Sequence, residues 1–340
     1  MQLPLERDAS LRPHNTFAVE ARAAWLARID SVDALGAVLA DERVRDLPRL
    51  VIGGGSNLLL TRDFPGLVLL IGIPGLERAG ETEDAWIVRV GAGEPWHGTV
   101  ERLLALDLPG LENLALIPGT VGAAPIQNIG AYGLELAERL HAVEVLDLES
   151  GALRSLTPQE CDFGYRDSAF KRALAGRVVI TAVSFALPKR WQPVAGYAEL
   201  AAELRARGAE TPAPRDVFDA VVAIRSRKLP DPARIGNAGS FFKNPIVSHE
   251  QRQVIAAHHP ALVAYPLAGQ RYKLAAGWLI EAAGLKGATR GQAGVYERQA
   301  LVLVNRGGAT GAEILQLARE VQDTVQARFG VKLEPEPVIV

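Results

Sequence analysis

The distribution of apolar residues predicts strands mainly in the first half of the chain. Short continuous apolar runs bounded by glycine or proline are typical of buried strands, and two apolar runs joined by a polar turn are typical of a hairpin. The turn at Ser150-Gly151 predicts one such hairpin. The strands that we expect lie at 50–52, 67–72, 86–90, 143–148, 153–156 and 177–187.

Apolar residues spaced three and four apart predict helices, most of them in the second half. Ser31 is expected to cap the first helix. Ser248 and Thr310 are each followed three residues later by Gln or Glu, which is the capping-box pattern, and Gly330 is expected to end the last helix. The helical patterns cover 32–39, which is the helix after Ser31, and 100–104, 197–207 and 216–224. The mixture indicates an α+β protein.

Composition and charge exclude several classes of protein. Apolar residues make up 48% and charged residues 22%, which is globular rather than disordered composition. The 37 basic and 39 acidic residues give a net charge of −2, which argues against a nucleic-acid-binding protein that relies on a broad basic surface. A single core rarely grows beyond about 250–300 residues. The 340 residues therefore predict two or three domains.

Cys161 is the only cysteine, so an intramolecular disulfide and cysteine-based zinc or iron–sulfur sites are excluded. None of the 6 histidines shows a metal-binding spacing, and no metal site is expected. Residues 1–10 do not have the pattern of a secretory signal, and no apolar run reaches the length of about 20 residues that a membrane helix needs. We expect a soluble cytoplasmic protein.

Two glycine-rich segments are candidates for holding a large cofactor. The segment 53–57, Gly-Gly-Gly-Ser-Asn, follows a strand and lets backbone amides approach an anion, so it fits either a tight structural turn or a diphosphate cradle. It is neither a P-loop nor a dinucleotide fingerprint. The segment 117–133, here called the ribbon, is apolar and rich in Gly and Pro. It fits a surface for a planar ring system, or a buried irregular loop without a ligand.

Four polar segments suggest chemistry. Arg166 lies between an aromatic and an acidic residue and fits either a carboxylate ligand or half of a surface ion pair with Asp167. Residues 225–228, Arg-Ser-Arg-Lys, fit either phosphate contacts or cations that stabilise a helix C-terminus. Ser240 follows a flexible Gly-rich turn and precedes two phenylalanines, where its hydroxyl could deliver a proton to carbon. Glu336 lies between prolines, which predict an extended segment without strong ladder bonding, and it fits either a catalytic acid or a solvated tail.

The ordered set of these motifs resembles the UDP-N-acetylenolpyruvoylglucosamine reductase family. The motifs run in the family's order from His14-Asn15-Thr16-Phe17 to Leu333-Glu334-Pro335-Glu336 and include Tyr165-Arg166-Asp167-Ser168 and residues 239–245. The resemblance implies an FAD-binding vanillyl-alcohol-oxidase/PCMH-type fold plus a C-terminal α+β substrate-binding domain. The implied domains are 1–188, with a PCMH-type core at about 15–188, a tyrosine-bearing loop and linker at 189–214, and 215–340, with 331–340 returning to the active site.

The same resemblance implies the reaction: reduction of the enolpyruvyl group of UDP-N-acetylglucosamine enolpyruvate through non-covalent FAD, with NADPH as co-substrate. Arg166, Ser240 and Glu336 are the implied catalytic residues, with Ser240 protonating the α-carbon. Tyr197, Lys228, Asn244 and Gln299 are the implied substrate contacts. The implied FAD contacts are Gly53, Gly54, Gly55, Ser56, Asn57, Gly119, Thr120, Gly122, Ala123, Ile126, Gly130, Tyr132 and Tyr165.

Two alternatives remain open at this point. One is another FAD-dependent oxidoreductase of the same fold, and the other is a non-catalytic flavin- or nucleotide-sugar-binding protein, which would not need Ser240. We expect a monomer that binds neither nucleic acid nor membrane.

Overall fold

The computed structural model describes residues 5–340 and divides into two compact units. The first unit contains residues 5–9, 23–55 and 64–227, and the second contains 10–22, 56–63 and 228–340. Two short N-terminal segments thus fold with the C-terminal residues. The predicted functional domains, with boundaries at 188 and 214, stay a prediction; the compact units separate after Arg227 and within the glycine-rich segment.

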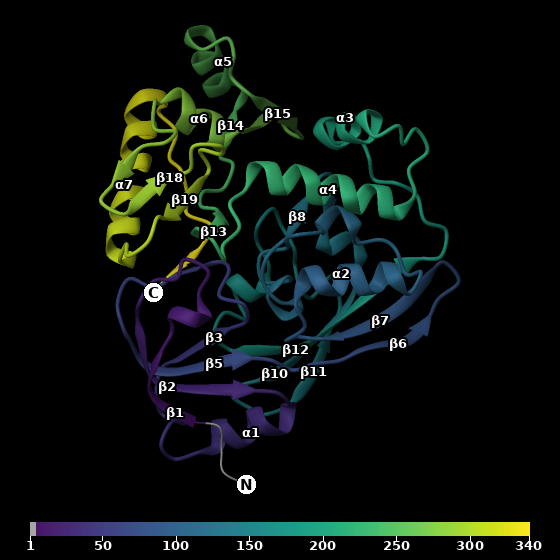
Figure 1. Cartoon of the computed structure of the whole chain (residues 1–340). Coiled ribbons are helices and arrows are strands. Elements are labelled where there is room, and N and C mark those ends of the chain that lie inside the picture. The colour runs from purple at the N-terminus through teal and green to yellow at the C-terminus, as the bar shows by residue number, and fades with distance from the viewer. Residues whose placement is uncertain (1–4) are drawn as a thin grey trace. The chain divides into compact units, whose positions relative to one another are not determined.

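The first unit contains a four-stranded sheet in the order β1-β2-β5-β3 (Figure 1). β5 pairs in parallel with both β2 and β3, and its mostly buried residues explain its continuous apolar sequence. Helix α1 (Val32–Ala40) begins as predicted at Ser31, whose side chain accepts a hydrogen bond from the Ala34 N–H. The strands are β1 (Leu5–Ser10), β2 (Arg22–Ile29), β3 (Arg49–Ile52) and β5 (Phe64–Ile71).

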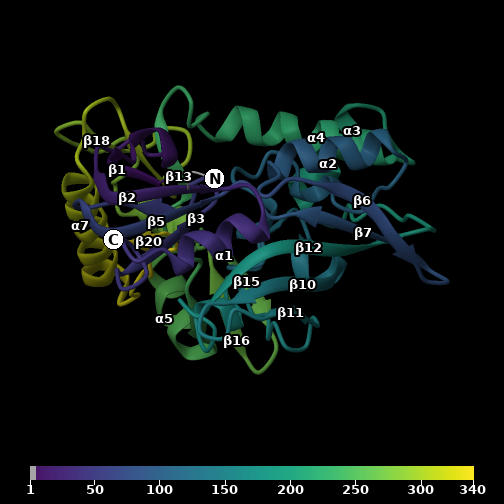
Figure 2. The same cartoon turned by 90° about the horizontal axis from the view of Figure 1, so that it is seen from below.

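A five-stranded antiparallel sheet, in the order β11-β10-β12-β7-β6, forms the rest of the framework of the first unit. The hairpin predicted at Ser150-Gly151 joins β10 and β11. Helices α2 and α4 pack together through the stacked rings of His97 and Phe218, whose centroids are 5.4 Å apart (Figures 1 and 2). The elements are β6 (Leu76–Glu81), β7 (Ala85–Gly91), α2 (Trp96–Ala105), β10 (Leu140–Asp147), β11 (Leu153–Leu156), β12 (Val178–Pro188), α3 (Ala198–Ala206) and α4 (Pro214–Lys228).

One sequence prediction in this region was wrong. Pro214 was expected in a linker before a helix that starts at Asp216, but it is the first residue of α4. Proline is tolerated there because the first N–H groups of a helix have no intrahelical partner and the ring fixes a helical φ. Asp216 instead accepts a hydrogen bond from the Ala213 N–H with its carboxylate.

The ribbon is neither a long helix nor a long strand, as its composition predicts. It contains the 3₁₀ turn Val121–Ala123 and the two-residue strand β8 (Gly130–Ala131), which pairs with β9 (Leu134–Glu135). The flanking residues are buried in the core of the first unit, where Trp96 packs edge-to-face on Phe185. This packing fixes an otherwise irregular backbone.

The second unit has its own core and two small sheets, in the orders β13-β19-β18-β17 and β14-β16-β15. Helix α7 packs beside β18 and β19, begins at a complete Thr310–Glu313 capping box and ends at Gly330, as predicted (Figure 1). The elements are β4 (Leu58–Leu59), β13 (Gly236–Ser240), β14 (Ile246–Ser248), α5 (His249–His258), β15 (Ala264–Leu267), β16 (Arg271–Leu274), α6 (Ala276–Ala282), β17 (Thr289–Arg290), β18 (Ala293–Val295), β19 (Val302–Asn305), α7 (Gly311–Phe329) and β20 (Val338–Ile339).

Two features are absent from residues 5–340. No helix in this range is long and apolar enough to cross a membrane. The same range contains no group of His, Cys, Asp and Glu side chains that could hold a metal ion.

Candidate active site

In the first unit, the glycine-rich turn at 53–55 packs directly against the ribbon. A Cβ at Gly53 would lie 2.2 Å from the Thr120 Oγ1, and a Cβ at Gly54 would lie 3.0 Å from the Gly119 Cα. Since a side chain at Gly53 would collide with Thr120, the glycine is required by this close approach. The two predicted cofactor-binding segments are therefore in contact.

The hydroxyl of Thr120 is the polar group at this contact. Its Oγ1 is buried and has no hydrogen-bond partner among the residues that the structure describes. A buried unsatisfied hydroxyl costs free energy, and a phosphate oxygen would supply the missing acceptor. The glycine turn, the ribbon and this hydroxyl therefore fit the diphosphate-bearing cofactor that the sequence predicts.

The ribbon is held in place by backbone hydrogen bonds on both sides of Thr120. Trp96 N–H donates to Gly119 O at 3.0 Å, and Val121 N–H donates to Glu94 O at 2.9 Å. Gly122 N–H donates to Ala92 O at 2.9 Å. These bonds fix the backbone that faces the glycine turn before any ligand is bound.

Asn128 organises the second half of the ribbon, although it is not among the cofactor contacts expected from the sequence. Its side-chain amide donates to the Glu135 carboxylate at 2.8 Å and to Gly164 O at 3.2 Å, while its Oδ1 accepts from Ala137 N–H at 3.0 Å. Asn128 also adopts a left-handed backbone, with φ of 44°. Asparagine tolerates this conformation better than most residues. The buried side chain thus ties the ribbon to the segment that carries Arg166.

Arg166 extends over the ribbon backbone. Its Nη2 donates to Gly130 O at 2.8 Å and its Nη1 donates to Asn128 O at 3.3 Å. The carboxylate of Asp167 forms an ion pair with Arg172. Carbonyl oxygens thus orient the Arg166 guanidinium, whose forked donors suit a ligand for a carboxylate.

Tyr132, Tyr197 and Arg225 gather at the same end of the ribbon. The Tyr132 and Tyr197 rings meet edge-to-face with centroids 5.5 Å apart. Burial raises the pKa of Tyr132 to about 12, so its phenol is neutral at physiological pH. Burial lowers the pKa of Arg225, with a smaller lowering from Arg166, and its Nε has no partner among the described residues. Two neighbouring guanidinium groups favour an anionic ligand here.

The basic residues at the C-terminal end of α4 lie in different environments. Arg227 forms an ion pair with Glu203 of α3 at 2.6 Å, so it serves the packing of these helices. Lys228 is exposed and is the last residue of α4. The sequence alone does not distinguish the half-buried Arg225 from its exposed neighbours.

In the second unit, Ser240 and Glu336 are held on adjacent backbone segments. Ser240 is the last residue of strand β13 rather than part of a free turn, and it pairs with Val302 of β19. Gly239 adopts φ of 69°, and the pairing register shifts between Asn237 and Ser240. This irregularity re-aims the hydroxyl at the strand end.

Glu336 is fixed by its backbone on both sides. Its N–H donates to Phe241 O at 2.8 Å, and its carbonyl accepts from the Asn57 side-chain amide at 3.3 Å. Pro337 has no N–H, and pairing resumes at Val338, whose N–H donates to Asn57 O at 3.0 Å. Residues 338–339 then pair in parallel with β4. The prediction of a segment without strong ladder bonding was therefore wrong on both sides of Pro337.

The remaining predicted residues of the second unit have identifiable structural contacts. Asn244 accepts a hydrogen bond from the Ala276 N–H with its Oδ1 at 2.9 Å, which leaves its NH₂ group to reach a ligand. Gln299 uses its Oε1 to accept from Leu301 N–H at 3.3 Å. Leu301 O in turn accepts from Phe241 N–H, so Gln299 belongs to the framework around Ser240.

The predicted site residues are thus distributed over both units. The first unit holds the glycine turn, the ribbon, Tyr165, Arg166 and Tyr197, and Arg166 lies 5.5 Å from the Tyr165 ring centroid. The second holds Ser56, Asn57, Lys228, Ser240, Asn244, Gln299 and Glu336.

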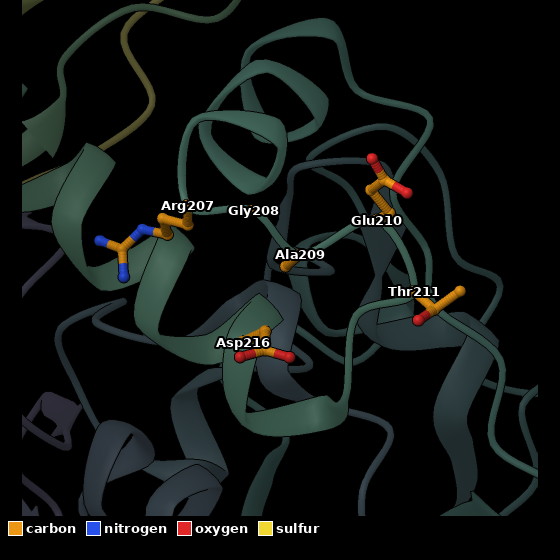
Figure 3. A pocket seen from close by; sticks show the side chains of 6 residues that line it. All are labelled: Arg207, Gly208, Ala209, Glu210, Thr211 and Asp216. Atoms are coloured by element: carbon orange, nitrogen blue, oxygen red, sulfur yellow. The ribbon is translucent and has the colours of Figure 1, made fainter.

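A separate hollow lies at the turn between α3 and α4 in the first unit (Figure 3). In Figure 3 the guanidinium of Arg207 extends away from Glu210 and Thr211. Arg207 is paired with Glu203 at 2.8 Å. No predicted site residue lines this hollow, which has a volume of about 450 Å³.

Comparisons with known proteins agree with both halves of this description. Residues 23–157 match the FAD binding domain, and residues 231–340 match the UDP-N-acetylenolpyruvoylglucosamine reductase C-terminal domain. The crystal structure of UDP-N-acetylenolpyruvylglucosamine reductase from Thermus caldophilus superposes with a TM-score of 0.69 and 26% identity, covering 98% of each chain.

Curated relatives are much more similar in sequence. UDP-N-acetylenolpyruvoylglucosamine reductase of Ralstonia nicotianae is 58% identical over 330 residues, which cover 96% of each chain. The protein of the same name in Azoarcus sp. is 57% identical over 342 residues, covering 99% of this chain and 98% of the relative. The chain therefore belongs to the UDP-N-acetylenolpyruvoylglucosamine reductase family.

Proposed function

We propose that Arg166, Ser240 and Glu336 carry the chemistry of this chain, which is an FAD-containing reductase of peptidoglycan precursor synthesis. Its substrate is UDP-N-acetylglucosamine enolpyruvate and its reductant is NADPH. The observation that supports the catalytic assignment most directly is the hydrogen bond from Glu336 N–H to Phe241 O, because it fixes the carboxyl-bearing residue beside the backbone of Ser240.

The turn at Gly53–Gly55, the Thr120 hydroxyl and the ribbon backbone would hold FAD. The packing of Gly53 on Thr120 and the unpartnered buried hydroxyl support this placement. The bound flavin supplies hydride transfer, from NADPH to the β-carbon of the enolpyruvyl group. The protein contributes placement of the reacting groups and fixed charges around them.

Arg166 would stabilise the charge that develops on the substrate. Hydride addition at the β-carbon pushes electrons toward the neighbouring carboxylate, which gives an enediolate-like dianion. A guanidinium stays charged at all physiological pH values, and its orientation here is set by Gly130 O and Asn128 O. A preorganised cation of this kind stabilises charge without reorganising during the reaction.

Glu336 would assist Arg166 only while it carries or shares a proton. An ionised carboxylate would repel the developing dianion, whereas a protonated one donates a hydrogen bond to it. The backbone contacts of Glu336 with Phe241 and Asn57 support a fixed position for this donor.

Ser240 would protonate the α-carbon. A serine hydroxyl is a weak acid, so it needs a strongly basic carbon acceptor and an approach of about 3 Å. Phe241 and Phe242, which follow it, are almost completely buried. These rings keep the backbone of Ser240 rigid, which supports an aligned hydroxyl.

Tyr197, Lys228, Asn244 and Gln299 would bind the UDP-sugar, with Lys228 neutralising phosphate. Tyr197 is exposed, and Asn244 has an NH₂ group that no described residue accepts. Monomeric state, location in the cytoplasm, and the absence of binding to nucleic acid or membrane stay predictions of the sequence.

The experiment that tests the function uses the purified holoenzyme. The protein should be yellow, NADPH should bleach it anaerobically, and UDP-N-acetylglucosamine enolpyruvate should restore the colour much faster than air. A yellow protein that NADPH does not bleach favours a binding protein. Rapid recovery in air without the UDP-sugar favours an oxidase of the same fold.

A further inference from the structure

The loop at 189–197, which carries Tyr197, is attached to the ribbon by two buried neighbours, Glu112 and Asn113. They form part of a 3₁₀ turn, Glu112–Leu114, and their exposed fractions are 2% and 0%. Buried polar residues of this kind cost free energy unless their hydrogen bonds are made. We call the pair the loop tether.

Asn113 bridges the loop and the ribbon through one amide group. Its Nδ2 donates to Tyr132 O at 2.9 Å and to Val194 O at 2.7 Å. Both partners are carbonyls that only accept, so the NH₂ group must face them and the orientation of the amide is determined. The opposite atom, Oδ1, has no donor among the described residues, so these two bonds are the polar role of the side chain.

Glu112 holds the start of the same loop. Its Oε1 accepts from the Trp191 indole N–H at 2.5 Å, and its Oε2 accepts from the Gly110 N–H at 2.7 Å. The carboxylate makes the indole hydrogen bond charge-assisted and therefore stronger than a neutral one. Trp191 and Val194 also pack against the core of the first unit.

Both attachments help to determine the position of Tyr197. Asn113 fixes the backbone of Tyr132 and the backbone three residues before Tyr197, and the two rings meet edge-to-face at 85°. Tyr197 itself is exposed. An exposed tyrosine on an irregular loop keeps one position only if its flanking backbone is held.

We propose that Glu112 and Asn113 are positioning residues that present Tyr197 to the UDP-sugar. They act through Tyr197 and touch no reacting atom. The inference rests on the proposed role of Tyr197 in substrate binding and adds the part of the chain that determines its position.

The test compares Asn113→Asp, Trp191→Phe and Tyr197→Phe in the FAD-loaded enzyme. Asn113→Asp keeps the shape but replaces the donor by an acceptor facing two carbonyls. Trp191→Phe removes the indole donor and part of the ring that packs against the core, but keeps an aromatic side chain. Each should raise the dissociation constant and KM for UDP-N-acetylglucosamine enolpyruvate about tenfold, the size expected for a lost hydrogen bond. The kcat and the FAD content should stay near wild type. Trp25→Phe, in β2 of the same unit, is the matched control and should leave KM unchanged, because the Trp25 ring lies against Arg7 and Arg43, outside the loop.

A double-mutant cycle decides whether the tether acts through Tyr197. Asn113→Asp should weaken binding much less in a Tyr197→Phe background than in wild type, because its effect is transmitted by the lost hydroxyl. Additive effects, or a wild-type KM in both Asn113→Asp and Trp191→Phe, would overturn the inference. Neither result would affect the proposed role of Tyr197 as a substrate contact. An unchanged KM in Tyr197→Phe would overturn the substrate contact and the tether with it.

Discussion

The side-chain amide of Asn57 donates a hydrogen bond to the backbone carbonyl of Glu336, a residue 279 positions away in the sequence. The parallel pairing of β4 with β20 continues the same contact. The end of the glycine-rich segment and the segment that carries the candidate acid are therefore one structural piece of the second unit. Glu336 is held by strand-like bonds although prolines flank it.

Glu336→Gln should slow the reaction with the UDP-sugar but not the reduction of FAD by NADPH. The amide keeps the shape and the backbone bonds, but it is a much weaker acid than a carboxyl group and cannot share a proton with the developing dianion. We expect FAD binding and flavin reduction by NADPH to persist and the substrate-dependent step to slow by about 100-fold or more. Rapid-mixing absorbance measurements check both steps.

Glu334→Gln is the matched control for that variant. Glu334 is exposed and only approaches Lys243, at 3.5 Å, so its removal should leave both steps intact. Equal effects at Glu334 and Glu336 would show that a general change of charge, and not the proposed acid, is responsible.

Gly53→Ala should weaken FAD binding. The new Cβ would collide with the Thr120 Oγ1, and overpacking of this kind costs about 1–3 kcal/mol. That cost corresponds to a loss of affinity of about tenfold or more, which flavin fluorescence titration of the apoprotein measures.

Gly36→Ala is the control, because a Cβ there meets nothing within 4 Å in the middle of α1. It should raise stability by about 0.5–1 kcal/mol and leave the flavin affinity unchanged, and a wild-type affinity in Gly53→Ala would refute the cradle.

Arg166→Lys should slow the substrate-dependent step by about 100-fold. An ammonium cannot replace the forked donor that joins Gly130 O and Asn128 O, so the cation would lose its orientation. The measurement is the rate of colour recovery after the UDP-sugar is added to the NADPH-treated enzyme. Arg172→Lys, which changes the nearby ion pairs with Asp162 and Asp167, should have little effect. Normal turnover in Arg166→Lys would remove this guanidinium from the mechanism.

Protonation of His97 should lower the stability of the folded protein in mild acid. Burial lowers its pKa below 6.5, and although Glu101 opposes the shift, Arg225 adds to it. Its Nδ1 accepts from Leu116 N–H at 3.1 Å, which requires the neutral ring. Below pH 6.5 the unfolded chain binds the proton more readily, so stability falls as pH decreases. The melting temperature between pH 7 and 5 should decline less in His97→Asn than in wild type, with His141→Gln as the control; equal slopes would contradict this role.

Local signals in the sequence predicted the longer elements well. Ser31 before a 3–4 spaced apolar face and the Thr310–Glu313 box identify α1 and α7, because caps and helical faces depend on neighbours within one or two turns. Strand β13 has the sequence Gly-Asn-Ala-Gly-Ser, which has no strand preference, and it forms through pairing with the distant β19. No local pattern could show that pairing.

The same distinction applies to the candidate site. Ser240, Arg166 and Glu336 were selected through motifs of the family, whereas the contacts that orient them come from backbone carbonyls of distant segments. The loop tether and the structural role of Asn128 were not predicted, because the role of a buried polar side chain is recognised only from its tertiary partners. Asn128 has one sequence signal, its residue type, because asparagine adopts a positive φ more readily than most residues.

The most direct test of the account follows the flavin absorbance of the Ser240→Ala holoenzyme through both halves of the reaction. We predict that NADPH bleaches this variant at the wild-type rate, and that turnover of UDP-N-acetylglucosamine enolpyruvate falls by about 100-fold or more, because the α-carbon has lost its proton donor. Turnover of the UDP-sugar at the wild-type rate by a fully flavin-loaded Ser240→Ala enzyme would contradict the account.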